Sequence, residues 1–79
     1  TESYLVLENS WACGKTVGDI NISTRTGAVI IALVRKNKPL PNPDLKFVVM
    51  VGDIFILLGS HVQLNKSLKT LKDGYVDEE

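Results

Sequence analysis

The fold follows from one stretch of the chain, TGAVIIALVR at residues 26–35. Its apolar run, residues 28–34, is rich in β-branched side chains, which favour strands. Gly27 supplies the positive φ that a turn before such a strand requires. Because nearly every position of the run is apolar, we expect both faces of this strand to be covered, the second face by the rest of the domain or by another chain.

The residues before this strand predict one short strand and one short helix. Residues 3–8 alternate loosely between apolar and polar side chains, as in a strand with one buried face. Thr16 can accept a hydrogen bond from a free backbone N–H and so begin a helix that runs through Ile20 or Ile22. Trp11 lies between these elements, and a lone tryptophan in a small domain fills the core more often than it marks an interface or stacks on a base.

Two further strands are expected after the central one. Residues 47–51 and residues 54–58 are apolar enough for short strands, and Gly52-Asp53 forms the turn between them. Asp53 could instead serve as a metal ligand or an acid–base group. An aspartate in a tight turn commonly bonds to its own nearby backbone, so the turn is the favoured interpretation. The whole sheet should have four or five strands.

The last part of the chain predicts a capped helix. Ser60 and Gln63 form a capping box, in which each side chain bonds to the backbone of the other residue. One apolar stripe at helical spacing consists of Leu64, Leu68 and Leu71. Gly74 can end the helix, and residues 77–79, all acidic, are expected to form a solvated tail.

Composition limits the class of protein. Nine basic residues balance nine acidic ones, whereas a protein that neutralises many phosphates carries a basic excess, so no nucleic-acid polymer is expected as a partner. The longest apolar run is far shorter than the roughly 20 residues that cross a bilayer, and no signal-peptide pattern is present. Cys13 is the only cysteine, which fits a reducing cytoplasm. The chain begins at Thr1 and runs directly into a strand, so we expect a domain excised from a longer polypeptide.

The sequence offers little catalytic chemistry. Cys13 and His61 are the only pair that could act as nucleophile and base, and no signature of a thiol enzyme surrounds either residue. A half-buried thiol and an exposed residue at a helix start are the favoured interpretations. We therefore expect no enzyme, no catalytic residues and no metal site. A thiol-dependent enzyme would need an activated Cys13. A Cys13→Ser variant that behaves like the unaltered protein would exclude this class of enzyme.

The segment Pro41-Asn42-Pro43 has two interpretations. Its rigid apolar surface carries one amide that both donates and accepts hydrogen bonds, and a stiff loop loses little entropy when it meets a ligand. The same prolines remove ladder donors, which would protect the edge of a sheet from aggregation. The residues alone leave both interpretations open.

Four segments together resemble the TrkA-C domain, also called RCK-C, over residues 3–72. In chain order they are GKTV at 14–17, TGAVIIALVR at 26–35, PNPD at 41–44 and GDIFILLG at 52–59. Domains of this family lie at the C-terminus of potassium-channel and potassium-transporter gating subunits and of cation:proton antiporters, where they sense ligands and do not conduct ions. The PNPD stretch and the closing LLGS at 57–60 are most similar to the antiporter version.

The resemblance implies an α+β fold, a small mixed β-sheet capped by helices, in a domain that pairs into a homodimer. It implies one domain over residues 1–79, with a core at 3–72 and an acidic tail at 73–79, attached to a membrane-embedded cation transporter or channel at the cytoplasmic face of the membrane. In several members cyclic di-AMP binds across the dimer cleft. The corresponding positions here are Ile22, Ser23, Val29, Ile30, Pro41, Asn42 and Pro43.

One position departs from the family pattern. The family often has an arginine directly after residue 22, where it can meet a phosphate, and this chain has Ser23. Arg25 is the candidate replacement and joins the expected site, although a shift of two residues changes both reach and direction. We expect a regulatory domain without a resident cofactor, whose ligand is cyclic di-AMP or another nucleotide. The alternative is a purely structural dimerisation domain.

Overall fold

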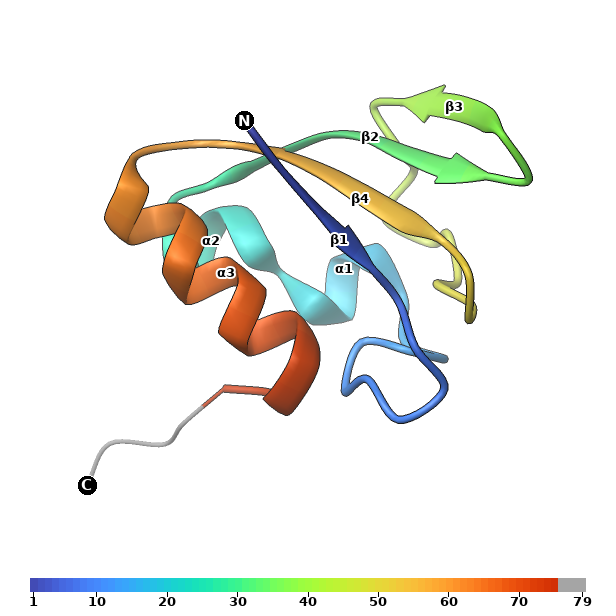
Figure 1. Cartoon of the computed structure of the whole chain (residues 1–79), viewed down its shortest axis with the longest axis horizontal. Helices are drawn as coiled ribbons and strands as arrows, with labels where there is room; N and C mark the ends of the chain where they lie inside the picture. Colours follow the sequence, from blue (N-terminus) through green and yellow to red (C-terminus); the bar gives the residue numbers. More distant parts are fainter. Residues whose placement is uncertain (76–79) are drawn as a thin grey trace.

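The computed structural model describes residues 1–75, which form a four-stranded sheet with three helices on one of its faces (Figure 1). The expected α+β class is therefore confirmed. The expected acidic tail at residues 77–79 lies outside the described residues. In chain order the elements are β1 (Glu2–Leu5), α1 (Val17–Ile20), α2 (Ile22–Thr26), β2 (Val29–Arg35), β3 (Lys38–Pro41), β4 (Ile54–Leu58) and α3 (His61–Asp73).

Every strand pair in this sheet is antiparallel, so the expectation of a mixed sheet is wrong. The strand order is β1-β4-β2-β3. β1 and β2, which are joined by the helical segment, run in the same direction. They do not pair with each other, because β4 lies between them and is antiparallel to both. β2 and β3 are joined by a two-residue turn at Lys36 and Asn37, whose φ angles of 53° and 66° suit a tight hairpin.

β2 confirms the strand predicted at residues 28–34, displaced by one residue. The middle of its helix-facing side is covered, because Leu33 and its neighbour Phe55 on β4 have no exposed surface. On the other side Val29 remains 49% exposed. The expected cover for that second side does not come from residues 1–75, since all three helices lie on the opposite face of the sheet (Figure 1).

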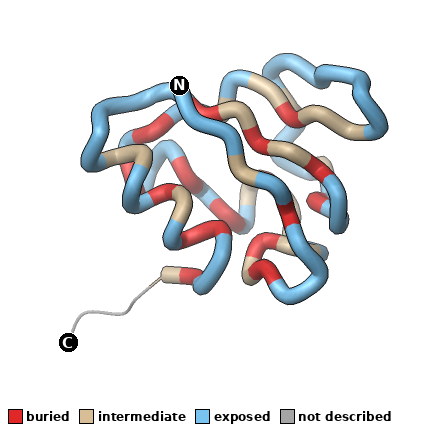
Figure 2. Tube along the Cα trace, in the orientation of Figure 1, coloured by how far each residue is buried: buried red, intermediate tan, exposed pale blue. Residues whose placement is uncertain are grey.

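The core lies between the sheet and the helices. Figure 2 shows buried positions recurring along the strands and on the helical turns that face them. Alternation along β4 places every second side chain, Phe55 and Leu57, in this layer. The buried apolar residues are Val6, Ala12, Val17, Ile20, Ile22, Ala28, Leu33, Val49, Phe55, Leu57 and Leu71.

Residues 47–51 do not form the predicted strand. Only Val48 makes a β-bridge, to Thr16, and Met50 and Val51 are more than half exposed. The backbone of this segment bonds instead to the loop before α1, where Lys15 O accepts from the Val49 N–H at 2.8 Å. A loop that meets another loop in this way satisfies its polar groups without joining the sheet ladder.

The helix predicted from Thr16 through Ile20 or Ile22 is α1, and an additional short helix follows it. Thr16 Oγ1 accepts from the Asp19 N–H at 3.1 Å, which confirms the cap, and α1 ends at Ile20. Asn21 follows with a left-handed φ of 54°, and α2 begins at the next residue. Sequence periodicity did not reveal α2, because a helix of five residues is too short to display an apolar stripe.

α3 confirms its predicted start and end. Gln63 Oε1 accepts from the Ser60 N–H at 2.8 Å, while Ser60 Oγ accepts from the Gln63 N–H at 3.2 Å, so both halves of the capping box are present. The helix ends at Asp73, and Gly74 follows it. None of the helices within residues 1–75 combines the length and the apolar character that crossing a bilayer demands.

Candidate ligand-binding site

A cavity of about 240 Å³ lies where the α1–α2 junction faces the start of β2 and the loop after β3. Three separate parts of the chain build it, so its shape depends on how they pack. The lining residues are Val17, Gly18, Asn21, Ile22, Ser23, Val29, Ile30, Asn42, Pro43 and Leu45.

The cavity brings together six of the eight residues expected from the sequence. They come from α2, β2 and the proline segment, and they are Ile22, Ser23, Val29, Ile30, Asn42 and Pro43. The two expected residues that do not line it are Pro41 and Arg25. Pro41 is the last residue of β3, where it pairs with Ala32. Because β3 is an edge strand, this proline fits the predicted role in protecting a sheet edge.

Arg25 points to a different part of the molecule. Its guanidinium carbon lies 3.9 Å from the ring centre of Tyr75, which follows α3. The Tyr75 hydroxyl in turn donates to the carbonyl oxygens of Ile20 and Asn21. Burial raises the pKa of Tyr75, and the positive charge of Arg25 opposes that rise. Arg25 therefore does not line the cavity, and it supports the α1–α2 junction through its contact with Tyr75. Tyr75 itself was expected in the tail but packs on the domain.

Asn21 and Gly18 shape the helical wall of the cavity. The left-handed Asn21 ends α1, and its N–H donates to Val17 O at 3.1 Å. The Gly18 N–H donates to Leu45 O at 2.8 Å, and a Cβ on Gly18 would lie 3.1 Å from that oxygen. A larger residue at position 18 would push the loop away, so this glycine sets the width of the cavity.

Asn42 closes the cavity from the loop side. Its φ of 52° is left-handed, a conformation that asparagine tolerates better than most residues. Its backbone N–H donates to Ile31 O at an N–O distance of 3.4 Å, which holds the start of the loop against β2. The side-chain amide is exposed and makes no hydrogen bond to residues 1–75, so its donor and acceptor are both free for a ligand.

Sequence reasoning missed Val17, Gly18, Asn21 and Leu45 as lining residues. Asn21 carried a usable signal, because an asparagine between two apolar helical turns is a common left-handed break. Leu45 carried none, since an exposed apolar residue in a loop has many possible surroundings.

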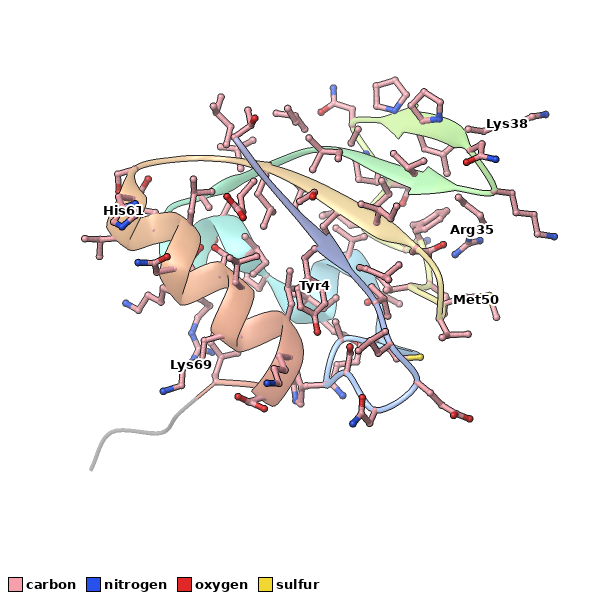
Figure 3. The ribbon with its side chains drawn as sticks, viewed as in Figure 1. Tyr4, Arg35, Lys38, Met50, His61 and Lys69 are labelled. Atoms are coloured by element: carbon pink, nitrogen blue, oxygen red, sulfur yellow. The ribbon has the colours of Figure 1, made fainter. Side chains whose placement is uncertain are left out.

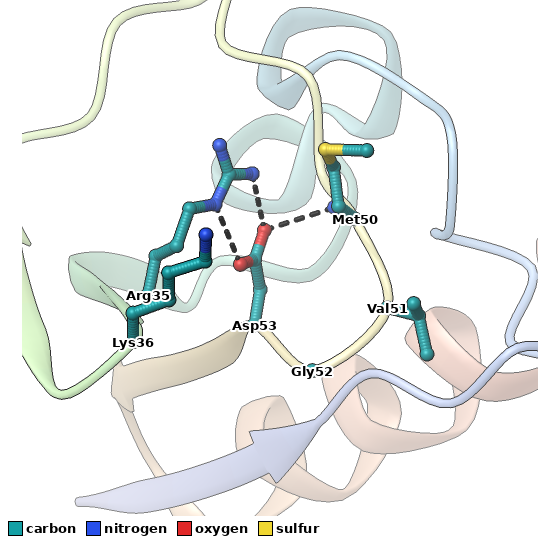
Figure 4. Close-up of a pocket in the computed structure, with 6 residues that line it drawn as sticks. All are labelled: Arg35, Lys36, Met50, Val51, Gly52 and Asp53. Atoms are coloured by element: carbon teal, nitrogen blue, oxygen red, sulfur yellow. Dashed lines mark hydrogen bonds and ion pairs between the residues drawn. The ribbon is translucent and has the colours of Figure 1, made fainter.

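A second cavity of about 500 Å³ lies at the end of the sheet near Arg35 and Met50 (Figure 4). Two of its three charged side chains pair with each other, because Arg35 donates to both carboxylate oxygens of Asp53 at 2.9 and 2.7 Å. Asp53 also accepts from the Met50 N–H at 2.9 Å, which confirms its predicted role in the turn. Although this cavity is the larger one, none of the expected ligand-binding residues lines it.

Cys13 and His61 occupy separate structural settings. Cys13 is a free, half-buried thiol that packs against the core. His61 is exposed at the first turn of α3, at the end of the molecule opposite Arg35 and Met50 (Figure 3). Trp11 is also half-buried against the core, where its ring meets Tyr75 edge-on with centroids 5.4 Å apart. Its core interpretation is therefore confirmed.

The family model of the TrkA-C domain matches residues 2–72, nearly the whole of the fold described above. The chain belongs to the TrkA-C domain family. The resemblance seen in the four sequence segments is thereby confirmed, with almost the same boundaries.

Solved structures of TrkA-C (RCK_C) domains share this fold. The RCK_C domain dimer of S. agalactiae BusR in complex with c-di-AMP is 28% identical, with a TM-score of 0.77, and the match covers 91% of this chain and 93% of that one. The RCK C domain of the potassium transport protein KtrA, also in complex with c-di-AMP, is 26% identical over 87% of this chain and 79% of that one, with a TM-score of 0.78. The GsuK channel bound to NAD is 27% identical over 89% of this chain, with a TM-score of 0.70.

The chain corresponds to one part of longer relatives. It spans 12% of the GsuK chain and 35% of the BusR chain that was solved in complex with busAB-promotor DNA. DNA therefore occurs with one relative of this TrkA-C domain, in a chain that contains much more than the matched domain.

Proposed function

We propose that this TrkA-C domain is the ligand-sensing regulatory module of a potassium or monovalent cation transport protein, at the cytoplasmic face of the membrane, and that its cavity binds cyclic di-AMP. The observation that carries the proposal is the cavity itself, which gathers six residues expected from cyclic-di-AMP-binding relatives. Two similar RCK_C structures contain that nucleotide. The parent is a cation:proton antiporter, a channel or a separate gating subunit, and the antiporter is favoured by the PNPD and LLGS segments.

The chemistry of the cavity suits a nucleobase. Ile22, Ile30 and Pro43 offer apolar surfaces that can flank a flat ring, and the free amide of Asn42 can both donate to and accept from a base edge. Binding of this kind is non-catalytic, since the residues around the cavity include no nucleophile–base pair. The proposed role is therefore recognition, and the ligand would bias one arrangement of the parent protein over another.

The size of the cavity supports a homodimer. Its volume of about 240 Å³ lies below the roughly 300–1,000 Å³ of sites that enclose a drug-sized ligand. A cyclic dinucleotide has two bases and two phosphates, so one protomer would hold about half of it. Two protomers related by a two-fold axis supply two such cavities, and the BusR RCK_C domain was solved as a dimer with this ligand.

Phosphate recognition is the weakest part of the site. Ser23 stands where relatives often carry an arginine, and Arg25 is engaged with Tyr75. The Ser23 hydroxyl can donate one neutral hydrogen bond, which is weaker than a charge-assisted one. We therefore expect this domain to bind cyclic di-AMP less tightly than a relative that has the arginine.

A purely structural dimerisation domain is the second candidate. The exposed apolar side chains of β2 and β4 favour it, because such a surface promotes association without any ligand. Under this alternative the domain would dimerise fully in the absence of nucleotides and bind none of them.

Calorimetry with cyclic di-AMP tests the proposal. Asn42→Ala should weaken binding by roughly 1 to 3 kcal/mol, the usual cost of leaving a buried polar partner unmet. Asn37→Ala is the matched control, because Asn37 also has a left-handed φ but lies in the β2–β3 turn, away from the cavity. Equal affinity in the Asn42→Ala and Asn37→Ala variants would show that the site is wrong. If the unaltered chain gives neither heat nor a shift in melting temperature with the nucleotide, the structural alternative stands.

A further inference from the structure

The larger cavity, beside Arg35, is separate from the candidate ligand site and shares no lining residue with it. Its volume of about 500 Å³ falls within the roughly 300–1,000 Å³ of sites that enclose a small organic ligand. One wall is formed by Arg35 and Lys36, at the end of β2 and the start of the β2–β3 turn. The other wall is the turn at residues 50–53, before β4 (Figure 4). The proposed function leaves this cavity unused.

Arg35 is held in a fixed position in the wall of this cavity. Its Nε and Nη2 donate to the carboxylate of Asp53, and Nη2 also donates to Val48 O. The guanidinium lies over the ring of Phe47, with Cζ 4.4 Å from the ring centre. Among residues 1–75, no acceptor bonds to the remaining nitrogen, Nη1. A side chain that is already held in place loses little entropy when it bonds to a ligand.

Lys36 supplies the excess positive charge of the cavity. Its side chain is exposed and extends alongside Arg35 (Figure 4). Within residues 1–75, no carboxylate lies within ion-pair distance of its ammonium group. Since Arg35 and Asp53 neutralise each other, the lining carries one unbalanced positive charge, that of Lys36. The electrostatics of the cavity therefore favour a ligand with a single negative charge.

Two neighbouring apolar side chains complete the lining. Met50 is 54% exposed and Val51 is 59% exposed. Their turn is fixed from both ends, because the Met50 N–H donates to Asp53 Oδ2 at 2.9 Å and the Gly52 N–H donates to Val6 O at 2.9 Å. A ligand that covers these side chains gains apolar burial, and the flexible thioether of Met50 adapts to its shape.

We propose that this cavity binds a small organic monoanion, an apolar chain that ends in a carboxylate. The carboxylate pairs with the ammonium group of Lys36 beside the guanidinium of Arg35, and the chain lies on Met50 and Val51. Both parts are needed, because an exposed ion pair alone contributes little free energy. A phosphate dianion fits less well, since its second charge would lie unpaired near Asp53. The inference is independent of cyclic di-AMP and of the dimer.

NMR titration of the isotope-labelled chain with octanoate tests the site. The backbone amides of Lys36 and of residues 50–53 should shift and saturate, because these residues line the cavity. Octan-1-ol has the same chain without the charge, and acetate has the charge without the chain. Each should bind at least about fivefold more weakly than octanoate. Equal affinities for the three compounds, or octanoate shifts at Ile22 and Asn42 but not at Lys36, would overturn the proposal.

Two variants with matched controls test the lining. Lys36→Gln should weaken octanoate binding about fivefold, whereas Lys38→Gln should not, because Lys38 is exposed on β3 and does not line the cavity. Val51→Ala should also weaken binding about fivefold, because part of the apolar wall is lost. Val62→Ala is its control, since Val62 is 74% exposed on α3, outside the cavity. The same NMR spectra show whether each variant is folded.

The affinity for cyclic di-AMP provides a second measurement on the same variants. Neither Lys36 nor Val51 lines the smaller cavity, so both variants should bind that nucleotide as the unaltered chain does. Weaker octanoate binding in Lys36→Gln and Val51→Ala alone supports the site. The proposal fails if both variants bind octanoate as tightly as their controls, or if they lose octanoate and cyclic di-AMP binding in parallel, which would indicate a general distortion of the fold.

Discussion

Arg35 and Asp53 form a bidentate ion pair in which Arg35 Nε donates to Oδ1 at 2.9 Å and Nη2 donates to Oδ2 at 2.7 Å. The pair joins the last residue of β2 to the turn before β4. Arg35 also donates to Val48 O at 2.8 Å and lies 4.4 Å from the ring centre of Phe47. Arg35 thus helps to hold the 47–53 segment in place, together with the backbone bonds of this segment to residues 14–17.

Asp53→Asn should lower stability and flatten its acid dependence. Burial by itself would raise the pKa of Asp53, but the hydrogen bonds from Arg35 and from the Met50 N–H outweigh it and hold that pKa below its ordinary value. A carboxyl with a lowered folded-state pKa contributes stability above its unfolded pKa of about 3.9, and that contribution is lost as pH falls through the folded pKa. Because Arg35 is about a third exposed, we expect a loss of roughly 1 to 2 kcal/mol at pH 7.

Urea denaturation of the Asp53→Asn variant at pH 7 and in steps down to pH 3 measures both effects. Asp19→Asn serves as the control, because Asp19 is exposed and its carboxylate has no hydrogen-bond partner among residues 1–75. Equal losses in the two variants would mean that the ion pair contributes nothing specific.

Gly27→Ala should cost more stability than Gly14→Ala, although the two glycines have nearly the same φ, 86° and 87°. Each substitution places an alanine in the left-handed region, at a cost of roughly 1 kcal/mol. A Cβ at Gly27 would also lie 2.5 Å from Gln63 Nε2, whereas a Cβ at Gly14 meets nothing within 4 Å. Since Gln63 belongs to the capping box of α3, its displacement should add about 1 kcal/mol. Thermal unfolding of both variants would reveal the difference, and equal melting temperatures would contradict it.

Tyr75→Phe should destabilise the α1–α2 junction by about 1 kcal/mol. The change removes the hydroxyl that donates to Ile20 O and Asn21 O but keeps the ring that Arg25 covers. The expected loss is that of one hydrogen bond in a half-buried setting. Chemical denaturation gives the free energy of unfolding. Because Asn21 lines the cavity, the affinity for cyclic di-AMP should also fall. An unchanged affinity would show that Tyr75 does not influence the ligand site.

Ser23→Arg should strengthen cyclic di-AMP binding by about tenfold. The substitution restores the arginine that relatives often carry at this point in the cavity lining, and a charge-assisted bond to phosphate is stronger than one from a hydroxyl. Thr24→Arg adds the same charge at the next residue, which is exposed and does not line the cavity. Calorimetry on both variants tests whether the arginine at position 23 contacts the phosphate directly. In that case only Ser23→Arg raises the affinity, whereas a general effect of added charge would raise both affinities equally.

Local patterns in the sequence determined much of the fold, and the family resemblance supplied most of the site residues. The β-branched run gave β2, the apolar residues 54–58 gave β4, and the Ser60–Gln63 pair gave the start of α3. These features depend on neighbours within a few residues, so they can be seen in the chain itself. The family resemblance added Ile22, Ser23, Val29, Ile30, Asn42 and Pro43, all of which line one cavity.

Contacts between distant residues decided the rest. Residues 47–51 have the composition of a strand, yet bonds to the loop at Lys15 and the Arg35–Asp53 pair hold them outside the sheet. Arg25 is close in sequence to the cavity but faces Tyr75, which lies 50 residues away in the chain. Sequence spacing fixes which residues are near neighbours along the backbone. Which way a side chain points, and what covers it, follows only when the sheet, the helices and the loops pack together.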